Sequence, residues 1–370
     1  MSELRFDAIK MQAALVGRSN PHPQFSASTA ANLISTDRVD PQIPLKDYEY
    51  INYARRNTCL PYLWQDAYER NRTEQSFKTA VLENETLKAV FLLEYGGRLW
   101  SLFHKPTQRE LLYVNPIFQP GNLAIRGAWF SGGIEWNFGL RGHTPFTCDP
   151  VFVATSRLDD GTPVLRMYEY ERVTCLPFQL DFYLPDKSEL LFVRVTIRNP
   201  DSRTVPIYWW SNIAVPETQD CRVLVPADSL YSFAYGSGKL VKLAHPYLDN
   251  TDRSRPTNLL RSSDSFYVIP TGRQPWIASV DKSGNGLFQA STKELRGRKL
   301  FAWGQSSGGK NWQQFLSLPN QSYIEIQAGL DRTQSTCQPL HGFDRREWIE
   351  TYGLITCDPE IVHGDRKSVV

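Results

Sequence analysis

The stretch WFSGGIEWNFGLRGHTPF, residues 129–146, surrounds one carboxylate with aromatic and glycine residues and then adds an imidazole. Glu135 lies between Ile134 and Trp136, and His143 follows in a polar, proline-terminated loop. Apolar surroundings raise the pKa of a carboxyl group unless partners compensate, so such an acid needs a hydrogen-bonding or functional reason. Glycines beside it allow a close backbone approach to a ligand or form a bulge. The pattern fits a catalytic acid and a satisfied structural glutamate equally well.

A second polar group shares one side of an expected strand in SYIEIQAGLDRTQ. Alternation puts Tyr323, Glu325 and Gln327 on one face, and Ile324 and Ile326 on the other. The isoleucines then belong to the core. The phenol, carboxylate and amide together line either a concave polar groove or a solvated outer face.

The stretch VPIYWWSNIAVPETQD supplies the third group of candidates. Trp210 and Asn212 share one face of this expected strand and Trp209 lies on the other, so we expect the strand to be covered on both sides. Glu217 follows the end of the strand, where loops often carry function. Trp303, in KLFAWGQ, adds another flat aromatic surface.

Strand signals dominate the elements that must position these residues. In ELLFVRVTIRNP, Val193, Val195 and Ile197 alternate with polar residues, which is typical of a strand with one buried face. Similar runs recur at short spacing between turn signals such as EYGGR and LDDGTP, a pattern that predicts a sandwich or barrel. Helical periodicity is scarce, and DRREWIETYG near the C-terminus is the best short helix candidate. The sequence therefore predicts an all-β sandwich or barrel with few short helices.

Three segments are expected along the chain. Residues 1–75 form an N-terminal arm, partly irregular, because its first part is rich in Ser, Asn, Pro and Thr without a period. Residues 76–355 form one large β domain, and residues 356–370 form a C-terminal tail. The arm could cover a sheet edge or contact a partner subunit.

Composition excludes several function classes. The 41 basic and 39 acidic residues give a net charge of +2 without a basic cluster, which argues against nucleic acid as a partner. The sequence contains no run of 18 apolar residues, so we expect no membrane span. The N-terminus lacks a signal-peptide pattern. The six cysteines have no C-x-x-C spacing, so we expect reduced thiols, no metal site and a cytoplasmic protein. No phosphate loop or dinucleotide fingerprint occurs, so no cofactor is expected; the oligomeric state is left open.

Four motifs, in this order, resemble those of a family of unknown function called DUF5107: GGRLWSLFHKPTQRELLY, WFSGGIEWNFGLRGHTPFTC, YWWSNIAVPET and YIEIQAGLDRTQ. That family belongs with the galactose mutarotase-like proteins, and many of its members continue into tetratricopeptide-type repeats. The resemblance spans nearly all of 76–352 and implies a large antiparallel two-sheet β-supersandwich. It fixes the fold better than the function.

The wider superfamily includes aldose 1-epimerases, in which a C-terminal strand carries a glutamate as general base. The segment Glu325-Ile326-Gln327 looks like that position, with Trp303 on the preceding strand. Mutarotases have Asn-His where Asn212 is followed here by Ile213. The resemblance therefore implies that His143, Glu217 or Glu135 would donate the second proton, since the reaction needs an acid and a base.

The candidate site residues are these. The catalytic candidates are Glu325, Glu135, His143 and Glu217. The candidate contacts to a sugar are Arg98, Trp136, Asn137, Arg141, Trp210, Asn212, Trp303 and Gln327.

Three functions fit these candidates, each with a carbohydrate ligand. The first is an isomerase of the aldose 1-epimerase kind, with Glu325 as base. The second is a glycoside hydrolase that pairs Glu325 with Glu135 or Glu217. The third is a sugar-binding module without catalysis. The fold alone cannot choose among them.

Overall fold

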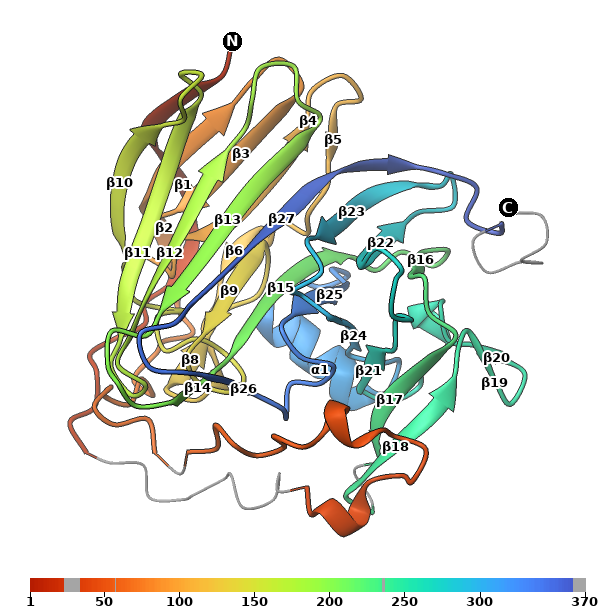
Figure 1. The fold of residues 1–370 in the computed structure, drawn as a ribbon. Coiled ribbons are helices and arrows are strands. Elements are labelled where there is room, and N and C mark those ends of the chain that lie inside the picture. Colours follow the sequence, from red (N-terminus) through yellow and green to blue (C-terminus); the bar gives the residue numbers. More distant parts are fainter. Residues whose placement is uncertain (23–33, 57, 235–236, 362–370) are drawn as a thin grey trace.

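The computed structural model describes residues 1–22, 34–56, 58–234 and 237–361 and is mostly β, as the sequence predicts. A 13-stranded sheet and an 8-stranded sheet pack face to face (Figure 1). The strand pairs named below are antiparallel, except that β1 and β6 run parallel. The larger sheet consists of β1 (Glu3–Ala14), β2 (Arg72–Glu83), β3 (Leu87–Leu92), β4 (Arg98–His104), β5 (Arg109–Glu110), β6 (Ile117–Phe118), β9 (Ile134–Phe138), β15 (Trp209–Pro216), β17 (Ser229–Ala234), β18 (Lys239–Ala244), β21 (Ser263–Tyr267), β24 (Gly297–Ala302) and β25 (Tyr323–Gly329).

The smaller sheet consists of β10 (Phe152–Arg157), β11 (Pro163–Glu171), β12 (Leu176–Tyr183), β13 (Leu190–Arg198), β16 (Arg222–Leu224), β22 (Trp276–Val280), β23 (Asn285–Ser291) and β27 (Arg345–Thr356). The short strand pairs are β7 (Gly121–Ala124) with β8 (Gly127–Trp129), β14 (Val205–Ile207) with β26 (Gln338–Leu340), and β19 (Tyr247–Leu248) with β20 (Thr251–Asp252). The helices are α1 (Ser307–Leu316) and the 3₁₀ turns η2 (Thr36–Arg38), η3 (Leu45–Asp47) and η4 (Pro256–Asn258). The expectation of few short helices is confirmed for the described residues.

The main core lies between the two sheets and follows the alternation in the sequence. On β13, Val193, Val195 and Ile197 are fully buried, whereas Arg194 and Arg198 are exposed. Each such aliphatic side chain contributes about 1.5–3 kcal/mol by leaving water. The predicted strand with one buried face is thus confirmed.

The predicted helix at DRREWIETYG is wrong, because this segment belongs to the twelve-residue strand β27. β27 lies between β13 and β23 in the smaller sheet. Period-2 alternation turns Trp348, Glu350 and Tyr352 into the core, where all three are buried. Glu350 made this alternation hard to recognise, because a charged residue at a core position is normally expected to face solvent.

The Glu350 carboxylate is fully buried and joins the two sheets. From β15 it accepts hydrogen bonds from Trp209 Nε1 at 2.9 Å and Ser211 Oγ at 2.6 Å. From the smaller sheet it accepts bonds from Gln289 Nε2 at 3.1 Å, Trp348 Nε1 at 3.3 Å and the Tyr352 hydroxyl at 2.8 Å. Five donors thus satisfy a charge that would be costly if it were buried alone.

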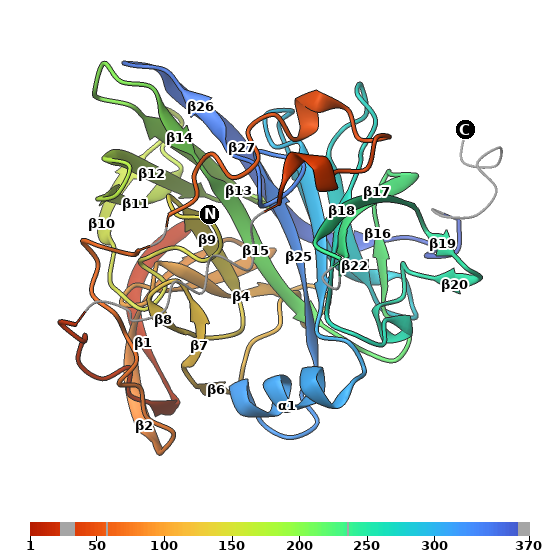
Figure 2. The same ribbon diagram turned by 90° about the horizontal axis from the view of Figure 1, so that it is seen from below.

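Part of the N-terminal segment is regular. β1 pairs with β2 over its full length and extends the larger sheet. Residues 34–56 then cross one face of that sheet beside β17 and β18 (Figures 1 and 2), with bridges Val39–Leu240 and Ile51–Thr336. The division into arm, domain and tail stays a prediction, and residues 362–370 of the expected tail lie outside the described residues.

β15 is covered on both faces, as its aromatic pattern predicts. Trp209 belongs to the main core. Trp210, on the other face, packs in a second cluster with Ile34, Ile43 and Ala54 from the N-terminal segment.

All six cysteines are free thiols. Within the described parts of the chain, no helix is long and apolar enough to cross a membrane. The same residues contain no group of three or more His, Cys, Asp or Glu side chains placed to hold a metal ion.

Substitution Glu350→Gln is expected to lower the free energy of unfolding by about 2–4 kcal/mol, because an amide group then faces buried donors that need an acceptor. Urea unfolding measures this. Glu347→Gln is the matched control on the same strand, since Glu347 is partly exposed and pairs with Arg194 at the surface; it should cost less than about 1 kcal/mol. Equal losses in both variants would contradict the bridging role of Glu350.

Candidate functional site

Four neighbouring strands of the larger sheet bring the predicted polar residues onto one face. Glu135 on β9 lies opposite Asn212 on β15. Asn212 lies opposite Gln327 on β25, and Gln327 lies opposite Lys299 on β24. Directly paired residues point to the same side of a sheet. Glu325 is two residues from Gln327 and therefore shares this face, away from the core side chains Ile324 and Ile326.

Glu135 has a partner for its charge on each side. His143 Nδ1 lies 2.7 Å from Oε2, Trp129 Nε1 donates to the same oxygen at 3.0 Å, and Arg98 forms an ion pair with Oε1 at 3.5 Å. Burial would raise the pKa of this carboxyl group, but the His143 and Arg98 charges and the two hydrogen bonds hold the pKa well below its ordinary value. Glu135 is therefore a fixed anion at neutral pH.

Arg98 is itself fixed at the start of β4. Its guanidinium donates to the carbonyl oxygens of Phe130 at 2.6 Å and Gly132 at 3.1 Å and to Thr147 Oγ1 at 2.9 Å. The Phe130 ring lies 3.8 Å beneath it. With the side chain only 2 % exposed, Arg98 acts as the buried counter-ion of Glu135 rather than as an exposed contact for a sugar.

The glycine pair before Glu135 serves strand packing. Gly133 has a φ of +68°, and a Cβ there would lie 2.3 Å from the Leu99 carbonyl oxygen on β4. These glycines therefore allow close contact with the neighbouring strand β4. This explanation replaces the interpretation that they let a loop approach a sugar.

Glu325 experiences the opposite electrostatic balance. Burial raises its pKa above the ordinary 4.5, against the lowering effect of the His143 and Lys299 charges, and the nearby Glu135 anion raises it further. Gln327 Nε2 donates to Oε2 at 3.1 Å, and Gln334 Nε2 in turn donates to Gln327 Oε1 at 2.8 Å. The carboxyl group is thus oriented and can exchange a proton nearer to neutral pH.

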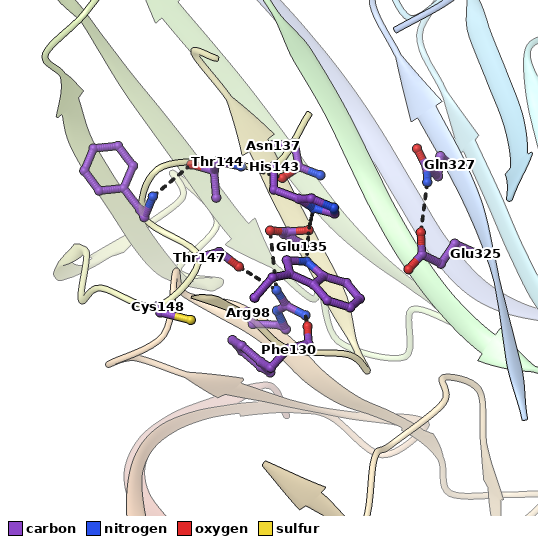
Figure 3. Close-up of polar contacts among 12 residues, drawn as sticks. Arg98, Phe130, Glu135, Asn137, His143, Thr144, Thr147, Cys148, Glu325 and Gln327 are labelled. Carbon is purple, nitrogen blue, oxygen red and sulfur yellow. Dashed lines mark hydrogen bonds and ion pairs between the residues drawn. The ribbon is translucent and has the colours of Figure 1, made fainter. Parts of the chain in front are cut away.

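Figure 3 shows the Glu135 cluster on one side of β15 and the Glu325–Gln327 pair on the other. Because two strand spacings and a two-residue step along β25 separate the two glutamates, their Cα atoms lie roughly 12 Å apart. Asn212 lies between them, with its Oδ1 buried and without a hydrogen-bond partner. The His143 side chain is 24 % exposed, whereas that of Glu135 is 3 % exposed, so the imidazole is the accessible member of its pair.

A family model described as "Domain of unknown function (DUF5107)" matches residues 54–346. The chain belongs to the DUF5107 family. This confirms the resemblance seen in the four motifs.

Solved structures give the fold of the DUF5107 chain. A TPR-domain containing protein from Parabacteroides distasonis has a TM-score of 0.76 at 20 % identity, over 96 % of this chain and 56 % of that one. This chain therefore spans little more than half the length of that protein. A galactose mutarotase-like protein from Clostridium acetobutylicum has a TM-score of 0.55 at 11 % identity, over 76 % and 96 % of the two chains. A putative aldose 1-epimerase from Escherichia coli has a TM-score of 0.52 at 13 % identity, over 75 % and 98 %. The galactose mutarotase-like supersandwich is thereby confirmed as the fold.

Two predicted sugar contacts of this DUF5107 chain, Trp136 and Trp210, are buried. Trp136 points into the main core, where its Nε1 donates to the Gly97 carbonyl oxygen at 3.1 Å, because residues next to Glu135 on a strand face the opposite side. Trp210 shares the polar face but is only 1 % exposed. Its ring packs against Gly297 and Gly329, where an added Cβ would lie within 2.7 Å of it.

Glu217 is separate from the two glutamates. It follows β15 and receives a hydrogen bond from Gln305 Nε2 at 3.4 Å, beside α1. Burial raises the pKa of its carboxyl group. No hydrogen bond or ion pair among the described residues joins it to Glu135, His143 or Glu325.

The remaining sugar-contact candidates surround the polar face. Asn137 Oδ1 accepts a hydrogen bond from the Thr144 amide at 2.8 Å and so fixes the loop that carries His143. Trp303 lies edge-on to Tyr323, at 6.2 Å between ring centroids, with its Nε1 buried and without a hydrogen-bond partner. Arg141 lines a cavity beside the same loop.

The isoleucine after Asn212 has a structural explanation. Ile213 is fully buried in the main core, because Asn212 already occupies the polar face and the next side chain must point away. A histidine at position 213 could not reach the candidate site. The imidazole comes instead from His143, on the loop after β9.

Sequence reasoning missed two members of the site, Trp129 and Lys299. Trp129 binds Glu135 and lies against His143, with ring centroids 5.0 Å apart. Lys299 is 4 % exposed, pairs with Asp264 at 2.7 Å and donates to Gln334 at 2.6 Å. Alternation along RKLFAWG would have put Lys299 and Phe301 on one face, but a lone lysine in a strand carried no functional signal.

We expect Glu135→Gln and Glu325→Gln to change stability in opposite directions at pH 7. The first removes the counter-charge of buried Arg98 and should cost about 3–5 kcal/mol. The second removes a carboxylate whose charged form burial disfavours, and should leave the protein at least as stable, with a gain on the order of 1 kcal/mol. Urea unfolding of both variants measures this difference.

The pH dependence follows from the two pKa directions. The lowered pKa of Glu135 gives a stabilisation that is present above pH 4.5 and is lost as the pH falls toward its folded value. The raised pKa of Glu325 makes the wild type lose stability as the pH rises from 4.5 through its folded value, so the advantage of Glu325→Gln should vanish near pH 4.5. A Glu325→Gln variant less stable than wild type at pH 7 would contradict this assignment.

Proposed function

We propose that this protein is a carbohydrate isomerase of the aldose 1-epimerase kind, with Glu325 as general base and His143 as general acid. The observation that carries the proposal is one sheet face with two carboxyl groups of opposite pKa direction. Titratable groups whose environments push their pKa values apart are typical of acid–base sites. One of these groups, Glu135, holds the partly exposed imidazole of His143.

The proposed reaction exchanges two protons across the anomeric centre. Glu325 takes the proton of the anomeric hydroxyl while His143 gives a proton to the ring oxygen, so that the bond from the ring oxygen to C1 breaks. C1 then rotates as an aldehyde. Closure on its other face returns one proton from Glu325 and one to His143, which yields the opposite anomer and regenerates the site.

The hydrogen bond between Glu135 and His143 supports this assignment of the acid. It engages Nδ1, so Nε2 is the ring nitrogen left for a substrate. Asn212 Oδ1, buried and without a hydrogen-bond partner between the two groups, can accept a sugar hydroxyl.

The glycoside hydrolase alternative has less support. Glu135 is held as an anion by three side chains and is a poor proton donor. Glu217 contacts Gln305 beside α1 and not the Glu325 group. A sugar-binding module without catalysis is the alternative that the following experiment separates.

Proton NMR of freshly dissolved aldoses measures anomer exchange directly. The wild type should accelerate exchange, and Glu325→Gln and His143→Gln should each lower the rate by about 10²–10⁴-fold, the range for general acid–base groups. Glu217→Gln is the control and should retain the rate. New reducing-end signals from oligosaccharides would instead show a hydrolase, and line broadening without exchange would show a binding module.

The rate should also depend on pH through Glu325. A base acts only when deprotonated, so kcat/KM should rise with pH, with a midpoint above 4.5 because burial raises this pKa. Lys299→Gln removes a positive charge that lowers the pKa, and should move the midpoint to higher pH. Lys310→Gln, whose lysine acts on Glu217 instead, should leave the midpoint in place.

A further inference from the structure

A chain of three hydrogen bonds crosses the polar face of the larger sheet and ends at Glu325. Lys299 Nζ donates to Gln334 Oε1 at 2.6 Å, and Gln334 Nε2 donates to Gln327 Oε1 at 2.8 Å. Gln327 Nε2 then donates to Glu325 Oε2 at 3.1 Å. Gln334, the last residue of the fourth motif, lies outside the sheet in the segment that follows β25. It is thus the link between a buried cation and the proposed base.

The ammonium group of Lys299 sets the direction of every bond in this chain. A side-chain amide can present either its oxygen or its NH₂ group to a neighbour, whereas an ammonium group only donates. Gln334 therefore turns its oxygen toward Lys299, which leaves its NH₂ group for Gln327. Gln327 in turn presents its oxygen to Gln334 and its NH₂ group to Glu325. Reversing one amide would bring two donors or two acceptors together, so Glu325 receives a donor rather than a carbonyl oxygen.

The cation and the segment that carries Gln334 are both held in place. Lys299 is 4 % exposed, and its Nζ also pairs with Asp264 Oδ1 at 2.7 Å. The segment after β25 is held from the other side by the N-terminal segment, where the Asn52 amide donates to the Ser335 carbonyl oxygen at 2.8 Å. A side chain that is fixed by such surroundings can hold a reactive group in one orientation.

We infer that Gln334 is a positioning residue for Glu325, because it holds the Gln327 amide in the orientation that donates to the carboxylate. The inference rests on the proposed function for the role of Glu325 as base, and on the hydrogen-bond chain for the role of Gln334. A donated hydrogen bond favours the ionised form of a carboxyl group. It therefore favours the form that can take the proton of the anomeric hydroxyl, and it fixes the direction in which the carboxylate points.

Other groups also act electrostatically on Glu325. The charged and titratable ones are Arg98 on β4, Glu135 on β9, His143 on the loop after β9, Lys299 on β24 and Tyr323 on β25. Substitution Gln334→Met removes none of these groups, whereas it removes both hydrogen bonds of the Gln334 side chain. A changed titration of Glu325 in this variant therefore reports the chain and not the surrounding charges.

The first experiment follows the titration of Glu325 by carbon-13 NMR of protein labelled at the glutamate carboxyl carbons. The Glu325 resonance is the one missing in Glu325→Gln. In Gln334→Met the pKa of Glu325 should rise, because Gln327 can then turn away and the carboxylate loses its oriented donor. Gln334→Glu is the second variant: it keeps an acceptor for Lys299 but offers no donor to Gln327, and should shift the titration in the same direction.

Gln338→Met is the matched control from a neighbouring position. Gln338 Nε2 donates to the Leu330 carbonyl oxygen at 3.3 Å and to Asp331 Oδ1 at 3.1 Å, so this variant also loses two hydrogen bonds near the end of β25. It should leave the titration of Glu325 unchanged. An unmoved titration in both Gln334 variants, or an equal shift in Gln338→Met, would overturn the inference.

The second experiment measures kcat and KM for anomer exchange in the same variants. Below the pH midpoint of the wild type, Gln334→Met should lower kcat about tenfold, as for one lost hydrogen bond to a charged group, with KM unchanged. Above the midpoint of the variant the loss should shrink, because Glu325 is then ionised in both proteins. A shifted NMR titration without anomer exchange by the wild type would overturn the isomerase proposal and still support the role of Gln334. Exchange by the wild type with an unchanged titration and kcat in Gln334→Met would overturn that role alone.

Discussion

The Glu350 carboxylate between the two sheets is the interaction on which the geometry of the candidate site depends. It accepts bonds from Trp209 and Ser211, the core-facing residues of β15. Fixing these side chains fixes the register and the facing of the strand. Asn212, the residue after Ser211, is thereby placed on the opposite face, on the strand between those of Glu135 and Glu325. A charge inside the sandwich thus positions polar groups outside it, and a hydrophobic residue at 350 would lack this directionality.

The same sheet face supports two glutamates in different charge states because their surroundings differ. Arg98, His143 and Trp129 converge on Glu135 from two strands and a loop and keep it anionic. Glu325 receives a bond from Gln327 and forms no ion pair among the described residues, so burial outweighs the effect of the His143 and Lys299 charges on its pKa. An arrangement that served stability alone would neutralise both groups. Retaining one unfavourably buried carboxylate is the kind of local conflict that functional sites show.

The fold was predictable because strand alternation and the four motifs are strong local signals. Alternation also grouped Glu325 with Gln327, and Asn212 with Trp210, but it could not show that the strands of Glu135, Asn212 and Glu325 are neighbours. The errors came where one residue broke a pattern. Glu350 made a core strand resemble a helix, and Trp136 looked like a sugar platform although its parity with Glu135 puts it in the core. Trp129 could not be assigned from sequence, since its contact with Glu135 depends on how β8 turns back toward β9. Long-range packing of this kind leaves no periodicity in the chain.

His143, the proposed general acid, comes from the loop after β9 and not from β15. Neighbouring positions on β15 must face opposite sides, so Asn212 and a reactive residue at 213 cannot both point toward a substrate. The loop after β9 is not bound by this rule, and Asn137 anchors it through the Thr144 amide. His143 therefore reaches the face from the side, with Glu135 directly beneath it on β9. In the proposed reaction, a donor placed this way would approach the sugar across β15 from Glu325, which is the opposed arrangement that proton transfer at two neighbouring oxygens requires.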